Sequence, residues 1–194
     1  MKKETVLLVV VVLIVGLLVG ILVGKGGRGP AAPSAPPQAS APAVNYQQNI
    51  AMLEGIVAGD PNNRNAWVEL GNNYFDSDQP VKAIEAYDKA LALGADDPNV
   101  LTDQGVMFRR MGWYDRAVEN FTKASQLAPT HVQSLYNLGL VYRFDLQDFA
   151  KAREAWGRFL ALSPAGPAAE QVRSEMQFME THPPLPQGGA PAAQ

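Results

Sequence analysis

The sequence predicts an all-α fold: a solenoid of three stacked repeats, each a helix-turn-helix of about 34 residues. Two observations predict it. Glycines recur at a constant interval, at Gly71, Gly105 and Gly139. Apolar residues inside the repeats follow the i, i+3, i+4, i+7 spacing of one helix face. A single helix pair of this kind cannot bury its own apolar surface, so it must stack on neighbours.

The first repeat shows the helical pattern most clearly. Trp67, Leu70, Gly71 and Tyr74 occupy one face of its first helix, and Ala83 begins the matching face of its second. Small residues at Gly71 and Ala83 allow the two helices to approach closely, while an aromatic side chain of the second helix fills the space beside them. This aromatic residue recurs in every repeat, as Tyr87, Phe121 and Trp156.

These residues resemble the tetratricopeptide repeat (TPR), whose pattern is W-x2-L-G-x2-Y, then A-x3-F, then a closing Ala and Pro. Three positions depart from that pattern. Gln104 replaces the usual Leu, Ala95 stands where a proline would close the first repeat, and the third repeat has one extra residue between Tyr142 and Ala152. We expect the extra residue in the turn, where added length costs little. The resemblance implies a TPR solenoid, a scaffold that carries many functions.

A single helix is expected at each end of the repeats. Ile50, Leu53 and Val57 share one face of the upstream helix, and Val172 and Met176 lie one turn apart in the downstream helix. Helices of this kind close the apolar ends of a repeat array. The predicted segments are a transmembrane anchor at 1–25, a Pro/Ala-rich linker at 26–43, a TPR domain at 44–181 and a disordered tail at 182–194. Within the TPR domain they are a capping helix at 44–59, repeats at 64–97, 98–131 and 132–165, and a C-terminal capping helix at 168–180.

The stretch Thr5–Gly24 carries no charged residue and is long enough to cross a bilayer as one helix. A cleaved signal peptide needs a shorter apolar core with a small-residue cleavage site close behind it, so we favour a retained anchor. Lys2 and Lys3 before this stretch balance Lys25 and Arg28 after it. The free amino terminus tips the balance toward a cytoplasmic N-terminus. We therefore expect a single-pass protein of the inner (cytoplasmic) membrane, with the TPR domain facing the periplasm in a Gram-negative cell.

Glycines four positions apart form a stripe inside this apolar stretch, at Gly16, Gly20 and Gly24. Such a stripe lets a second membrane helix approach closely, which makes a homodimer through the anchor possible. The alternative is that glycine is simply common in membrane helices. The Pro-rich linker that follows prefers an extended polyproline II conformation and would hold the next domain away from the membrane.

Composition excludes several classes of function. The chain has no cysteine, which excludes disulfides, thiolate metal sites and covalent haem attachment. Its net charge is −3, and because the segment up to Pro30 is basic, the part after it is more acidic than the whole, which argues against nucleic-acid binding. His131 and His182 have no nucleophile near them in the pattern. The sequence predicts a protein that is not an enzyme and that has no metal or cofactor.

The TPR resemblance implies a binding groove, because the inward surface of this family comes from the first helix of each repeat. Twelve positions match it: Asn65, Val68, Asn72, Phe75, Asn99, Thr102, Val106, Arg109, Gln133, Tyr136, Leu140 and Arg143. Amide side chains on one row can bind an extended peptide backbone, and the two arginines can bind a carboxylate. The alternative is that these are ordinary exposed helix residues. The five-residue carboxylate clamp of co-chaperone TPR domains is not matched, since only Asn72 is retained.

We interpret the chain as a membrane-tethered, non-catalytic scaffold that binds a peptide or protein partner in this groove. The order of anchor, helix, Asp60–Asn63 and Ala66–Tyr74 is also similar to bacterial TPR subunits of the cytochrome c maturation machinery. That similarity implies an alternative role, holding an apocytochrome for haem attachment. An accessory role in secretion or pilus assembly fits the same pattern.

Overall fold

The computed structural model describes residues 45–182 and confirms an all-α helical array. Within this range eight α-helices and one π-helical turn follow one another: α2 (Tyr46–Gly59), α3 (Arg64–Asp76), α4 (Pro80–Ala92), α5 (Pro98–Arg110), α6 (Tyr114–Leu127), α7 (Val132–Leu140), η1 (Val141–Asp145), α8 (Phe149–Leu162) and α9 (Pro167–Thr181). No helix in residues 45–182 is long and apolar enough to cross a membrane. The predicted anchor, its glycine stripe and the linker lie outside the described residues, as does the predicted tail beyond His182.

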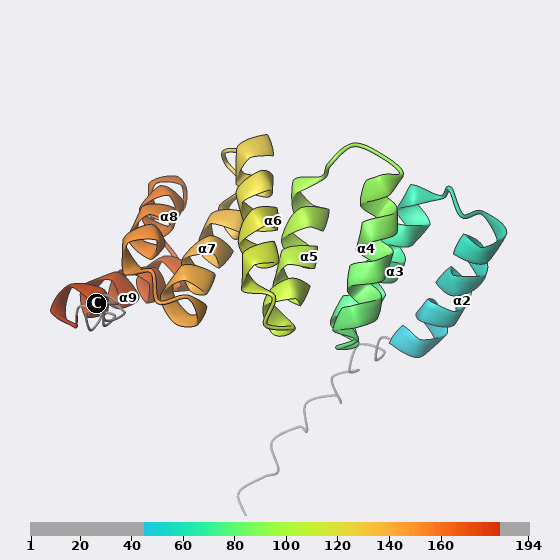
Figure 1. Cartoon of the computed structure of the whole chain (residues 1–194), viewed down its shortest axis with the longest axis horizontal. Helices are drawn as coiled ribbons and strands as arrows, with labels where there is room; N and C mark the ends of the chain where they lie inside the picture. Colours follow the sequence, from blue (N-terminus) through green and yellow to red (C-terminus); the bar gives the residue numbers. More distant parts are fainter. Residues whose placement is uncertain (1–44, 183–194) are drawn as a thin grey trace, which may run out of the picture. The chain divides into compact units, whose positions relative to one another are not determined.

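The helices stand side by side in chain order (Figure 1). α3 packs on α4, α5 on α6, and α7 with η1 on α8, which makes three helix pairs. α2 packs on α3 at one end, and α9 packs on α8 at the other. One apolar cluster runs from α2 to α8, and a second joins α7, α8 and α9. Each pair thus buries its apolar face against the next pair, as a stacked repeat requires.

A glycine facing an aromatic ring holds each helix pair at close range. Gly139 shows the closest approach, because a Cβ placed there would lie 2.0 Å from Nε1 of Trp156. The ring cannot shift freely, since Nε1 of Trp156 donates to the carbonyl oxygen of Tyr136 at 3.0 Å. The equivalent contacts in the other repeats join Gly71 to Tyr87 and Gly105 to Phe121. Only glycine allows this approach, so the regular glycine period records a packing requirement.

The extra residue of the third repeat lies in the first helix, and our expectation of a longer turn was wrong. α7 continues as η1, in which the N–H of Leu146 donates to the carbonyl oxygen of Val141 at 2.9 Å, a π-helical bond. The turn between the two helices has the same length in every repeat, with one residue at positive φ: Asp78, Gly112 or Gln147. A π-helical turn absorbs one residue inside a helix. The turn and the second helix therefore keep their places, and the first helix gains Asp145.

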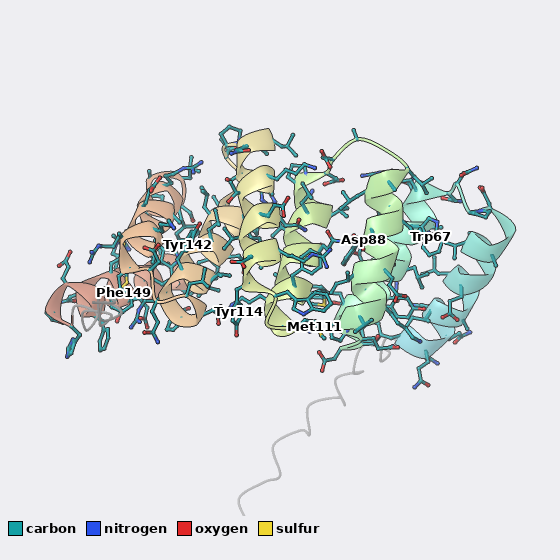
Figure 2. The ribbon with its side chains drawn as sticks, in the orientation of Figure 1. Trp67, Asp88, Met111, Tyr114, Tyr142 and Phe149 are labelled. Atoms are coloured by element: carbon teal, nitrogen blue, oxygen red, sulfur yellow. The ribbon has the colours of Figure 1, made fainter. Side chains whose placement is uncertain are left out.

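A series of hydrogen-bonded polar side chains, called the polar chain below, crosses the middle of the array at Gln104, where neighbouring repeats have Leu70 and Leu138. Gln104 is 2% exposed. Its Nε2 donates to Oδ1 of Asp88 at 2.7 Å, and its Oε1 accepts from Nδ2 of Asn120 at 2.8 Å. Asp88 lies on α4 (Figure 2) and Asn120 lies on α6. The buried amide is thereby satisfied, and hydrogen bonds join three successive helices in one register.

Capping side chains set the starts of most helices. A side chain accepts a backbone N–H of the first turn at Asn45, Asn63, Asp97, His131 and Asp148. A proline stands at the start of three helices, as Pro80, Pro98 and Pro167. Proline fits there because its missing N–H would have no partner inside the helix.

Candidate peptide-binding groove

The twelve candidate groove residues all lie on the first helices of the repeats, α3, α5 and α7 with η1. Three of them are exposed amides at the same position of successive repeats, namely Asn65, Asn99 and Gln133. Oδ1 of Asn99 faces Nε2 of His131 at 3.2 Å. Within residues 45–182 the side chains of Asn65 and Gln133 make no hydrogen bond. Those two amides therefore keep both a donor and an acceptor for a partner.

The apolar members are half-buried, with one side packed on the core: Val68, Phe75, Val106, Tyr136 and Leu140. Tyr136 is fixed on two sides. Its ring lies 5.5 Å from the ring of Phe159, and its hydroxyl donates to Oε1 of Gln171 on α9 at 3.1 Å. These residues offer a firm apolar surface beside the amides.

Two polar members of the predicted groove are already engaged. Oδ1 of Asn72 accepts from the hydroxyl of Tyr87 at 2.9 Å. Thr102 is only 4% exposed, and its hydroxyl donates to the carbonyl oxygen of Pro98 at 2.7 Å. Helix packing covers Thr102, and its buried hydroxyl bonds back to the preceding turn as such residues do. Thr102 therefore does not line an exposed surface, contrary to expectation.

The predicted carboxylate-binding arginines each have a partner within the array. Arg109 on α5 forms an ion pair with Asp145, the residue that η1 adds to the next repeat. The side chains are 30% and 16% exposed. Water therefore reaches both groups only in part, and the pair joins the second repeat to the third.

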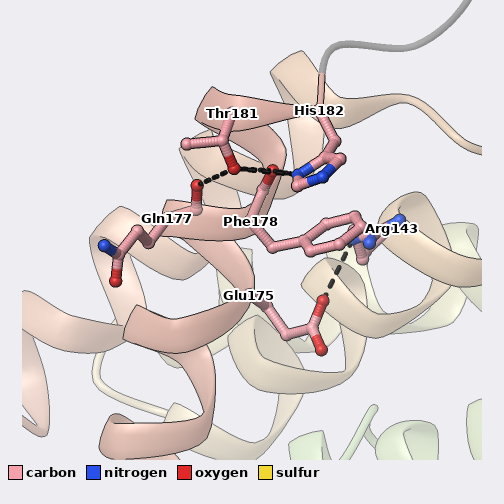
Figure 3. A network of polar contacts seen from close by, with 6 residues as sticks. All are labelled: Arg143, Glu175, Gln177, Phe178, Thr181 and His182. Atoms are coloured by element: carbon pink, nitrogen blue, oxygen red, sulfur yellow. Dashed lines mark hydrogen bonds and ion pairs between the residues drawn. The ribbon is translucent and has the colours of Figure 1, made fainter.

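Arg143 on η1 is held by the C-terminal helix α9. Its Nε donates to Oε2 of Glu175 at 3.2 Å, and its guanidinium lies 4.7 Å from the ring centre of Phe149 and 5.0 Å from that of Phe178. Figure 3 shows the pair with Glu175 and the His182 ring stacked on Phe178, whose centres are 4.2 Å apart. Arg143 is only 13% exposed and serves to attach α9 to the third repeat.

Carboxylates outside the twelve candidate residues lie in the α3–α5 half of the groove, and the TPR resemblance places one of them, Asp76, at the groove edge. Burial first, and then the charges of Asp103, Asp76 and Glu69, raise the pKa of the Tyr87 hydroxyl. Burial, and then Asp76 and Asp97, raise the pKa of Asp103 to about 6. Glu69, Asp76 and Asp103 have no Lys or Arg partner among residues 45–182. The signal was present in the sequence, because Glu69 and Asp103 lie one period apart.

Two clefts lie away from the groove. One of about 430 Å³ is lined by α2, α3 and α4, and one of about 280 Å³ is lined by α6, α7 and α8. Leu70 and Leu138 line them at equivalent positions, whereas Gln104 at the matching position carries the polar chain. In the part of the chain that the structure describes, no group of three or more His, Asp or Glu side chains is placed to hold a metal ion.

Family models identify the class of protein that this geometry belongs to. Tetratricopeptide repeat models match residues 64–97 and 102–169, together more than half of the chain. The chain belongs to the tetratricopeptide repeat family.

Curated relatives match over the repeats. The chain is 28% identical to human Protein O-mannosyl-transferase TMTC1 over 111 residues, 55% of this chain and 12% of that protein. It is 29% identical to the Heat-shock protein cognate (HSC) co-chaperone sgt12 of Aspergillus fumigatus over 86 residues, 44% of this chain and 25% of that protein. It is 30% identical to the Photosystem I assembly protein Ycf3 of Prochlorococcus marinus over 101 residues, 44% of this chain and 58% of that protein. The chain thus spans a quarter or less of the length of the first two.

Solved structures share the fold. MamA superposes with a TM-score of 0.66 at 23% identity, covering 70% of this chain and 78% of that chain. The pilF protein of Pseudomonas aeruginosa superposes with a TM-score of 0.62 at 27% identity, covering 71% and 62%. The first TPR of Spaghetti (RPAP3), bound to an HSP90 peptide, superposes with a TM-score of 0.56 at 23% identity, covering 60% and 93%.

Proposed function

We propose that this protein is a membrane-tethered, non-catalytic adaptor that binds an extended segment of a partner protein over the first helices of its repeats. The observation that carries the proposal is the row of exposed amides across α3, α5 and α7, next to half-buried apolar side chains. Amides can bond the backbone of an extended chain, and a fixed apolar surface gives its side chains contact. A related fold in complex with a peptide supports the same use of the scaffold.

The tether and its topology are part of this proposal. Thr5–Gly24 would span the inner membrane once, and the linker at 26–43 would place the TPR domain in the periplasm. A reporter active only in the periplasm, fused after Ala43, is expected to be active. Activity of a cytoplasm-only reporter at the same site would instead place the repeats inside the cell.

The pathway is a separate question. The cytochrome c maturation role has only the order of anchor, helix and first repeat in its favour, and the names of TMTC1, sgt12 and Ycf3 place none of them in cytochrome maturation. The role in secretion or pilus assembly stands on the same pattern. Loss of the gene would separate them, since one role predicts loss of c-type cytochromes and the other a defect in secretion or pili.

A capture experiment tests the adaptor role. Asn65→Arg with Gln133→Arg places two long side chains across the groove at exposed positions, so the fold should be unaffected. Crosslinked partners recovered from membranes with the wild-type chain are expected to be lost with this variant. The matched control is Gln126→Arg with Ala161→Arg, two exposed positions on the second helices α6 and α8. Partners lost equally from both variants, or from neither, would contradict binding over the first helices.

A further inference from the structure

The groove presents an imbalance of charge that points to the kind of partner. Arg109 and Arg143 face Asp145 and Glu175, so their charges are offset within the array. Glu69, Asp76 and Asp103, which lie on α3 and α5, have no such offset among residues 45–182. The part of the groove on α3 and α5 is therefore acidic, although the sequence suggested a groove that binds carboxylates.

Asp103 is the central group of this acidic part. It is only half-exposed, and neither a hydrogen bond nor an ion pair to its side chain occurs among the described residues. Asn72, whose Oδ1 is bound to Tyr87, lies on the facing helix α3. A carboxylate at this place repels a negatively charged ligand and can accept a charge-assisted hydrogen bond from a cationic donor.

The rest of the groove is neutral and apolar. Tyr136 and Leu140 lie on α7 with one side exposed. A ligand that fits the whole surface therefore has a cationic group at the α3–α5 end and apolar side chains toward α7. The exposed amides of Asn65 on α3 and Gln133 on α7 can bond its backbone.

Resting on the proposed function, we propose that the groove selects an extended partner segment that carries a lysine or arginine, with its cationic group at Asp103. The chemistry is a charge-assisted hydrogen bond from the ammonium or guanidinium to the carboxylate, supported by the field of Asp76. Acidic segments and free chain termini with a carboxylate are disfavoured by the same field. Charge complementarity thus narrows the partner to a basic, partly apolar peptide segment.

The test uses the purified full-length chain in detergent and a phage-displayed random dodecapeptide library. Peptides selected by the wild type are expected to be enriched in lysine and arginine relative to the starting library. Asp103→Lys should abolish the enrichment, whereas Glu119→Lys on the exposed side of α6 should keep it. Circular dichroism melts of each variant show that the fold is kept. For the most frequent peptide, fluorescence anisotropy with Asp103→Asn should show about a tenfold or larger loss of affinity.

The outcomes separate this inference from the proposed function. Selected peptides that are acidic or neutral, but whose capture is abolished by Asn65→Arg with Gln133→Arg, would overturn the charge preference and leave the groove as the binding surface. Peptides whose capture ignores that variant would contradict groove binding itself. An Asp103→Asn variant that binds a basic peptide as tightly as wild type would also overturn the inference. Selection of no peptide would contradict both proposals.

Discussion

The guanidinium of Arg109 on α5 is paired with the carboxylate of Asp145, which the π-helical turn η1 adds to the next repeat. The inserted residue and the ion pair therefore belong together. The third repeat departs from the regular period at the point where it supplies a partner for the second repeat. A π-helical turn of this kind often marks a functional feature, and here it fixes the junction between two repeats.

This pairing predicts an energetic coupling between Arg109 and Asp145. Unfolding in urea of both alanine variants and the double variant should give a coupling free energy of about 1 kcal/mol, because both groups are partly shielded from water. The control pair is Arg110 and Asp78, at 2.9 Å but with Asp78 84% exposed, where coupling should be close to zero. Equal coupling free energies in the two pairs would show that the ion pair formed by the π-helical turn is no stronger than an ordinary surface pair.

The glycine–aromatic packing predicts opposite effects for two glycine substitutions. Gly139→Ala should destabilise the array by about 1–3 kcal/mol, because the new methyl group would overlap the ring of Trp156. Gly157→Ala should stabilise it by about 0.5–1 kcal/mol, because no atom lies within 4 Å of the added Cβ and alanine favours the helix. Denaturant unfolding measures both. A neutral Gly139→Ala would show that the helix pair can separate at little cost.

The polar chain at Gln104 predicts a non-additive pair of substitutions. Asn120→Ala should cost about 1–3 kcal/mol, because it leaves the buried Oε1 of Gln104 without its donor. Adding Gln104→Leu removes that buried polar group, so the double variant should be more stable than Asn120→Ala alone. Thermal melts of the three variants test this. If the double variant melts at a lower temperature than Asn120→Ala alone, the polar chain contributes to stability beyond satisfying the hydrogen bonds of Gln104.

The raised pKa of Asp103, about 6 against an ordinary value of 3.8, predicts a pH-dependent effect of Asp103→Asn. The folded state holds this proton more tightly than the unfolded state. The resulting stability is present below about pH 3.8 and is lost as the pH rises through about 6. The variant should therefore gain stability relative to wild type between pH 4 and pH 7.5. Melting temperatures of both proteins at the two pH values check this prediction. If the difference between variant and wild type is the same at both, the pKa of Asp103 is not raised in the folded state.

The sequence was sufficient to predict the repeat fold because the same helix-packing contact recurs within every repeat. Gly71 and Tyr87 belong to the same repeat, so the contact that sets the helix pair is local and recurs in every repeat. The place of the extra residue could not be predicted in this way. The repeat period shows only that one residue is added somewhere between two recurring positions. Whether it enters a turn or a helix depends on backbone hydrogen bonds that leave no pattern in the sequence.

Which groove side chains are free to bind a partner could be predicted only in part, for a related reason. The positions of Arg109 and Arg143 follow from the period, but their partners come from the next repeat and from α9. Each arginine lies far from its partner in the sequence, by 36 and 32 residues. Which carboxylate it pairs with depends on side-chain geometry that the sequence pattern does not show. Thr102 shows the same limit, because it is buried whereas Val68 and Tyr136 at the equivalent positions of the other repeats are half-exposed.

Site-specific photo-crosslinking tests the central claim most directly, that the first-helix surface binds the partner. A photoreactive residue would replace Gln133 on α7 or, as the matched glutamine control, Gln126 on α6, both of them exposed. Irradiation of membranes that contain the full-length chain should give a discrete crosslinked band at position 133 and none at position 126. A band at position 126 with none at position 133 would contradict the account and place the binding surface on the second helices.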